Sequence, residues 1–135
     1  MGYITVIGGG KNQKDLTLEA ASFAINKLFP KARTYDITIK LGSDTNDCFE
    51  YDERTYKINI NKKQKIDDFL TAIFHEITHV KQYIYDNLTD TYNFKVHENG
   101  MILYEEYINH PAEKEAYKMQ EVLLTEWETK YGITV

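Results

Sequence analysis

The chain has 135 residues, a net charge of -5 and ordinary shares of apolar and charged residues, which together predict one globular domain over 1–135. The acidic balance argues against nucleic-acid binding, because that function needs a basic surface. No stretch approaches the roughly 18 apolar residues of a membrane span, and no signal peptide is recognisable. We therefore expect a cytoplasmic protein without membrane partners; composition leaves its oligomeric state open.

The N-terminal segment 1–15 is rich in glycine and lysine, so the sequence leaves open whether it is a flexible leader or an inhibitory segment. The run Gly8–Lys11 lacks the spacing of a phosphate-binding loop. A single cysteine, Cys48, excludes an internal disulfide and predicts an ordinary core or surface thiol.

The first half of the chain alternates between helical and extended patterns. Apolar residues at helical spacing predict a helix over 16–29, which Pro30 ends. Strict alternation over 35–41 predicts a half-buried strand. Two shorter strands are expected over 48–51 and 56–60.

The second half is mostly helical. A long periodic pattern predicts a helix over 67–85. Residues 92–105 are compatible with a hairpin turning at Asn99-Gly100. A last helix is expected from Pro111 to about residue 130, since proline favours the first helical position. The predicted fold class is therefore α+β, with a small sheet of about three strands.

The helix over 67–85 carries two histidines away from its apolar stripe. His75 and His79 are four residues apart, so they lie one turn above the other. Neutral imidazoles at that separation can both bind one metal ion at about 2.0–2.1 Å. Glu76 is rotated by about 100° around the helix axis and can accept a proton from a water molecule that the metal acidifies. The pattern predicts one Zn²⁺ per chain, with Glu76 as the catalytic base; the alternative is a structural helix with two surface histidines.

A catalytic zinc usually has a third protein ligand, and the last helix offers three candidates near its start. Glu113 and Glu115 lie on opposite sides of the apolar stripe, so helical periodicity does not choose between them. Glu113 also suits the free N–H groups of a helix start without any metal. His110 ranks lowest, because three-histidine sites place the last histidine closer to the first pair.

Together these two segments resemble the gluzincin zinc peptidases, above all the smallest ones. In that family His-Glu-x-x-His is followed by a later helix bearing Glu-x-x-Ala. The stretch 75–79 matches the first motif and 113–116 the second. The stretch 111–117 also resembles a segment of small metallopeptidases encoded by phages or bacteria. The resemblance covers roughly residues 56–120 of the chain.

The resemblance implies a minimal zincin-like domain that hydrolyses peptide or protein substrates, with Glu113 as the third ligand. It also implies a tyrosine or histidine that stabilises the oxyanion, for which His97 and Tyr107 are our predictions. The other candidates for that donor are Tyr104, Tyr117 and His110.

Two further residue groups lie near the predicted zinc site. The strand over 56–60 directly precedes the zinc helix and is expected to bind extended substrate along an edge of the sheet. Gln82, close beyond His79, either orients a ligand or is solvated, and we favour solvation.

Three other functions stay open at this stage. The chain could be a catalytically silent zinc module that holds a peptide or protein partner. It could be a peptidase inhibited by its own segment 1–15. It could also be a structural α+β protein whose motif is accidental.

Overall fold

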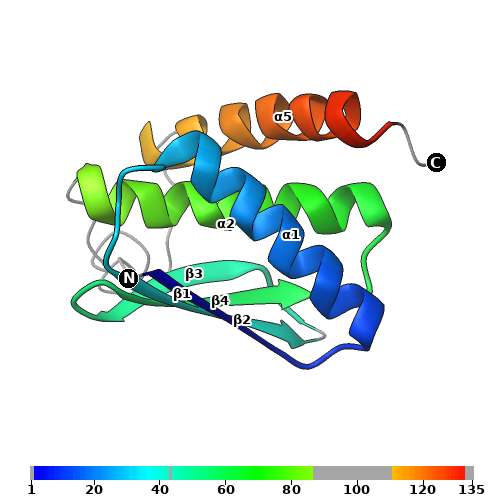
Figure 1. The fold of residues 1–135 in the computed structure, drawn as a ribbon, viewed down its shortest axis with the longest axis horizontal. Coiled ribbons are helices and arrows are strands. Elements are labelled where there is room, and N and C mark those ends of the chain that lie inside the picture. The colour runs from blue at the N-terminus through cyan, green and yellow to red at the C-terminus, as the bar shows by residue number, and fades with distance from the viewer. Residues whose placement is uncertain (1, 43, 87–110, 133–135) are drawn as a thin grey trace, which may run out of the picture.

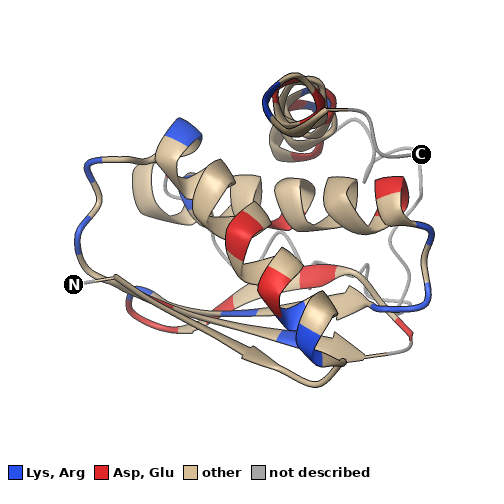
Figure 2. Ribbon diagram, turned by 45° about the vertical axis from the view of Figure 1, so that its right-hand side comes forward, with Lys and Arg blue, Asp and Glu red and all other residues tan. Residues whose placement is uncertain are grey.

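The computed structural model describes residues 2–42, 44–86 and 111–132. These residues form four strands and three helices: β1 (Gly2–Ile7), α1 (Lys11–Leu28), β2 (Tyr35–Gly42), β3 (Asp47–Asp52), β4 (Thr55–Asn61), α2 (Ile66–Tyr85) and α5 (Pro111–Tyr131). In Figure 1 the sheet is the lower layer, α1 and α2 cover one of its faces, and α5 lies on α2. Figure 2 looks nearly along α5 and shows α2 between it and the sheet. The predicted α+β class is confirmed.

The sheet has four strands in the order β1-β2-β4-β3, so the expectation of about three strands was wrong. β1 pairs with β2 in parallel, β2 with β4 in parallel, and β3 with β4 antiparallel. The additional strand is β1, whose residues are all exposed or only partly buried. An edge strand of this kind has a weak hydrophobic pattern, which explains why it was missed.

Residues 2–7 are thus part of the sheet, and Lys11 already begins α1, so the structure does not support a flexible leader over 1–15. Two glycines connect the strand to the helix. Gly8 and Gly9 have φ angles of 85° and 71°, which glycine adopts without steric penalty. A Cβ atom at Gly8 would also lie 2.7 Å from the backbone oxygen of Leu41.

The other expected elements are present, with shifted ends. α1 begins five residues earlier than predicted, and the strands and α2 extend by a residue or two at one or both ends. The predicted hairpin over 92–105 lies outside the described residues. β4 lies between β2 and β3, so the prediction that 56–60 is an edge strand was wrong. That prediction relied on the order of the strands along the chain. In the structure β3 pairs antiparallel with β4 and takes the edge position of the described sheet.

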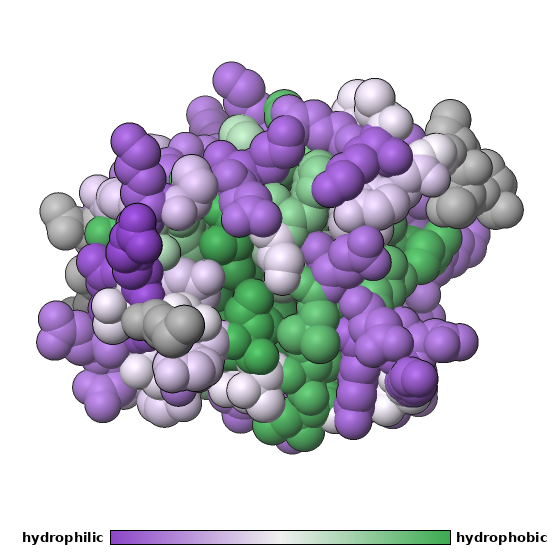
Figure 3. Space-filling model, viewed as in Figure 1, coloured by the Kyte–Doolittle hydropathy of each residue, from purple (hydrophilic) through white to green (hydrophobic). Residues whose placement is uncertain are grey.

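The core fills the space between the sheet and the helices. It includes Cys48, which is only 5% exposed, in agreement with a core thiol. Figure 3 shows apolar side chains gathered in the middle of one face of the molecule, with hydrophilic side chains around them. None of the helices in the described part of the chain has the length and hydrophobicity needed to cross a membrane.

An aromatic cluster attaches the C-terminal half of α5 to the other helices. The ring of Trp127 packs edge-on against Phe23 of α1 at 5.4 Å, and its centroid lies 6.0 Å from that of Phe74 of α2. We expect Trp127→Ala to lower the free energy of unfolding by about 3 kcal/mol, because it removes a buried indole and leaves a cavity. Urea denaturation would measure this; a loss below about 1 kcal/mol would contradict the assigned packing.

Candidate metal centre

The facing sides of α2 and α5 carry polar residues at the same spacing. On each helix these residues stand at positions i, i+4 and i+7, which places them in one stripe. The stripe of α2 is His75, His79 and Gln82, and that of α5 is Glu113, Tyr117 and Gln120. The helices run in opposite directions (Figure 1), so the start of α5 meets the end of α2.

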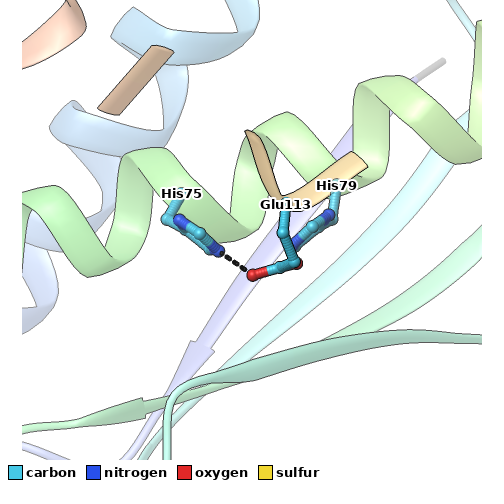
Figure 4. A group of neighbouring side chains, drawn as sticks. All are labelled: His75, His79 and Glu113. Carbon is cyan, nitrogen blue, oxygen red and sulfur yellow. Dashed lines mark hydrogen bonds and ion pairs between the residues drawn. The ribbon is translucent and has the colours of Figure 1, made fainter. Parts of the chain in front are cut away.

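The carboxylate of Glu113 lies between the two imidazoles of α2, as Figure 4 shows. Its Oε1 is 3.1 Å from His75 Nε2, and its Oε2 is 2.7 Å from His79 Nε2. Donor atoms that bind one zinc tetrahedrally at 2.0–2.2 Å lie about 3.3 Å apart. Each distance between the carboxylate and an imidazole would therefore need to lengthen by only a few tenths of an ångström, and all three ligand atoms lie within 4.8 Å of one another.

All three side chains are buried: His75 is 8% exposed, His79 4% and Glu113 1%. An ionised carboxylate at such a position is costly unless a positive charge accompanies it. Two neutral imidazoles and one carboxylate also make a donor set suited to zinc and similar transition metals. This buried group could therefore hold a metal ion.

The structure places Glu113, and not Glu115, beside the histidines. The two residues are about 200° apart around α5, so they face different surroundings. The Glu115 carboxylate instead binds Lys81 Nζ at 2.9 Å and Gln82 Nε2 at 2.8 Å. Burial opposes ionisation of Glu115, but these hydrogen bonds outweigh it and lower its pKa. The third candidate, His110, lies outside the described residues.

A second layer of hydrogen bonds holds the outer nitrogen of each imidazole. His79 Nδ1 lies 2.7 Å from Gln82 Oε1, and His75 Nδ1 lies 2.8 Å from Gln120 Oε1. Such bonds fix the orientation of metal-binding histidines and leave Nε2 for the ion. Gln82 is only 2% exposed, so the expectation that it is solvated was wrong. Gln120 was not predicted, although its spacing from Glu113 could have indicated it.

Glu76 lies beside this group without belonging to it. It is 5% exposed, and burial raises its pKa to about 7, against the opposing effect of the two neighbouring histidines. A carboxylate with this basicity can accept a proton near neutral pH. For His79, burial disfavours the charged ring, but Glu113 and Glu76 outweigh that effect and raise its pKa. Protons and a metal ion therefore compete for this imidazole.

A cavity of about 300 Å³ opens next to the group. Its wall is mostly polar and comes from the loops before β3 and α2 and from both facing helices. The lining residues are Asn46, Gln64, Asp68, Thr71, Ala72, His75, Glu76, Tyr117 and Gln120. His75 and Glu76 both reach this space, so a molecule bound in it would contact a candidate metal ligand and the candidate base together.

No protein-family model matches this chain, and comparisons with curated proteins and with solved structures found no similar one either. The gluzincin resemblance therefore depends on the two sequence motifs and stays a prediction. The spatial arrangement of the buried group does not depend on it.

Of the residues considered for oxyanion stabilisation, Tyr117 is the one in the described part of the chain. Its ring packs edge-on against His75, with 4.8 Å between the centroids, and it lines the cavity. His97 and Tyr107, the two predicted donors, lie outside the described residues, as does Tyr104. The predictions for His97 and Tyr107, and the alternative Tyr104, stay untested.

Proposed function

We propose that this chain is a zinc-dependent peptidase of the gluzincin type, in which His75, His79 and Glu113 bind the metal and Glu76 acts as the base. One observation carries the proposal. A buried carboxylate from α5 meets both imidazoles of the His-Glu-x-x-His helix, while the glutamate within that motif lines the adjoining cavity instead. With this division of roles, one glutamate can bind the metal while the other accepts the proton of the attacking water.

A zinc ion bound by this group would supply a Lewis acid that acidifies water and offsets negative charge on a carbonyl oxygen. The Glu76 carboxylate accepts a proton from the attacking water and later transfers it to the leaving amine. Tyr117 of α5 lines the cavity, and its hydroxyl is a candidate donor to the developing oxyanion. Burial of the base excludes bulk water from this proton transfer.

Two measurements on the purified 135-residue chain test the function. Elemental analysis should find one zinc per chain, and a mixed peptide library should be cleaved only by the zinc-loaded protein. Absence of bound metal would favour a structural protein. Full zinc occupancy without cleavage of any peptide would favour a silent module that holds a partner.

The cavity also predicts a preference among substrates. Asp68 and Glu76 are acidic, and the described residues on the wall include no lysine or arginine. We expect faster cleavage of peptides with lysine than with glutamate next to the scissile bond. Asp68→Asn should reduce that preference about two- to fivefold, the range for an exposed charge pair.

The matched control is Asp67→Asn. Asp67 occupies the same first turn of α2 as Asp68 but does not line the cavity. Both substitutions remove a carboxylate near the helix start and so cost similar stability. The ratio of kcat/KM for the two peptides should change in the Asp68 variant alone; an equal change in both would contradict the assignment.

A further inference from the structure

We propose that Gln82 is a positioning residue that sets the tautomer of His79 and attaches the start of α5 to the metal-binding helix, with Glu115 as one of its two partners on α5. The inference rests on the metal-binding part of the proposed function. It concerns a residue outside both sequence motifs.

Each polar atom of the Gln82 side chain is used. Oε1 lies 2.7 Å from His79 Nδ1. Nε2 donates one hydrogen bond to the backbone oxygen of Ala112 at 2.9 Å and a second to Glu115 Oε1 at 2.8 Å. With 2% of the residue exposed, water cannot substitute for these partners at low cost.

The two partners on α5 determine which way the amide faces. A backbone carbonyl and a carboxylate can only accept hydrogen bonds, so the NH₂ group must point toward Ala112 and Glu115. The amide oxygen therefore points toward His79. Because that oxygen can only accept, His79 must carry a proton on Nδ1. Nε2 is then the nitrogen whose lone pair can bind a metal, once the ion displaces the proton that Nε2 donates to Glu113 Oε2, 2.7 Å away.

The same bonds fix the position of Glu113. Ala112 immediately precedes Glu113, and Glu115 follows it by two residues. Hydrogen bonds on both sides of Glu113 hold the first turn of α5 against the last turns of α2. Lys81 completes the arrangement, since its Nζ lies 2.9 Å from both Glu115 Oε2 and Asp86 Oδ2. One side chain thus positions a histidine ligand and the glutamate ligand from different helices.

Gln120, which holds His75, is less constrained. Its Nε2 lies 3.2 Å from Glu121 Oε2, an exposed bond to the next residue on the same helix. Gln120 therefore does not connect its histidine to a network as Gln82 does. For this reason we assign the larger effect on metal binding to Gln82.

Metal affinity and the state of the His79 ring test the proposal. Gln82→Met, which keeps the volume but removes all three bonds, should weaken zinc binding about 10- to 100-fold, as measured by competition with a chelator. In the cobalt-loaded Gln82→Met variant, the Nδ1–H proton of His79 should exchange with solvent much faster than in the cobalt-loaded wild type. Gln13→Glu and Gln13→Met on α1, remote from the group, are matched controls and should change neither readout.

A swap of the two partners provides a rescue. In Gln82→Glu the new carboxylate faces that of Glu115, and affinity should fall. In the double variant Gln82→Glu/Glu115→Gln, the carboxylate at position 82 can accept from His79 Nδ1 and from the amide at position 115, while the hydrogen bond to the Ala112 carbonyl stays lost in both variants. The double variant should therefore bind zinc at least about threefold more tightly than Gln82→Glu alone, an expectation drawn from the restored pairing. This comparison needs only variants that keep a polar side chain, so it holds even if Gln82→Met does not fold.

The outcomes separate the two proposals. A wild type without metal affinity overturns the proposed function and this inference together. A wild type that binds zinc while Gln82→Met binds it equally well, or a double variant no better than Gln82→Glu alone, overturns the positioning role only. A purely structural role would lower the melting temperature of the metal-free protein without changing the exchange of the His79 proton.

Discussion

Replacing Glu76 by glutamine is expected to leave zinc binding intact and to lower kcat for peptide hydrolysis about 1000-fold. General-base catalysis contributes roughly 10²–10⁴-fold, and no other described carboxylate both lines the cavity and is buried. Glutamine keeps the size of the side chain but cannot accept the proton. The carboxylate is not among the three groups that could hold the metal, so occupancy should not fall. Peptide cleavage and elemental analysis of the same preparation would measure both quantities.

The control for this substitution is Glu19→Gln. Glu19 is an exposed residue of α1. Its replacement by glutamine therefore removes the same charge without changing the cavity. It should cleave peptides at the wild-type rate. Turnover by Glu76→Gln within tenfold of the wild type would contradict the role of the base, whereas loss of metal would show that this carboxylate supports the ligands.

The sequence predicted the elements whose patterns depend on burial. α2 is bounded almost as expected, because a helix packed between a sheet and a second helix needs a continuous apolar stripe. The alternation of β2 likewise reflects one buried and one partly exposed face. β1 lacks such a pattern because it forms an edge. Sheet order was not predictable for a related reason: alternation indicates which face of a strand is buried, but not which strand lies next to it.

The candidate site likewise combines features that the sequence predicts with features that depend on how the helices pack. Four-residue spacing within α2 predicts that His75 and His79 face one point, since both positions belong to a single rigid helix. The choice between Glu113 and Glu115 depends on how α5 is rotated against α2, and that rotation results from packing far along the chain, around Trp127. The role of Gln82 depends on the same rotation, because its partners all belong to α5 or to His79.

Replacing Glu113 by glutamine is expected to weaken zinc binding by well over 100-fold, more than the loss of an outer-layer partner. The amide has one neutral oxygen in place of two charged ones, and its NH₂ group would face an imidazole Nε2 that must bind the metal. The side chain is 1% exposed, so it cannot turn toward water to avoid this conflict. Competition with a chelator of known affinity would give the dissociation constant.

Glu115→Gln is the matched control for Glu113→Gln. It removes a carboxylate from the same turn of α5, yet the amide oxygen at that position can still accept from Gln82 Nε2, and we expect affinity to fall only a few-fold. Both variants change the net charge equally, so a long-range electrostatic effect would weaken them alike. Loss of zinc in the Glu115 variant with retention in the Glu113 variant would place the third ligand on the opposite side of α5. Such a result would require that helix to rotate by about 200°, which the burial of Leu123 and Trp127 opposes.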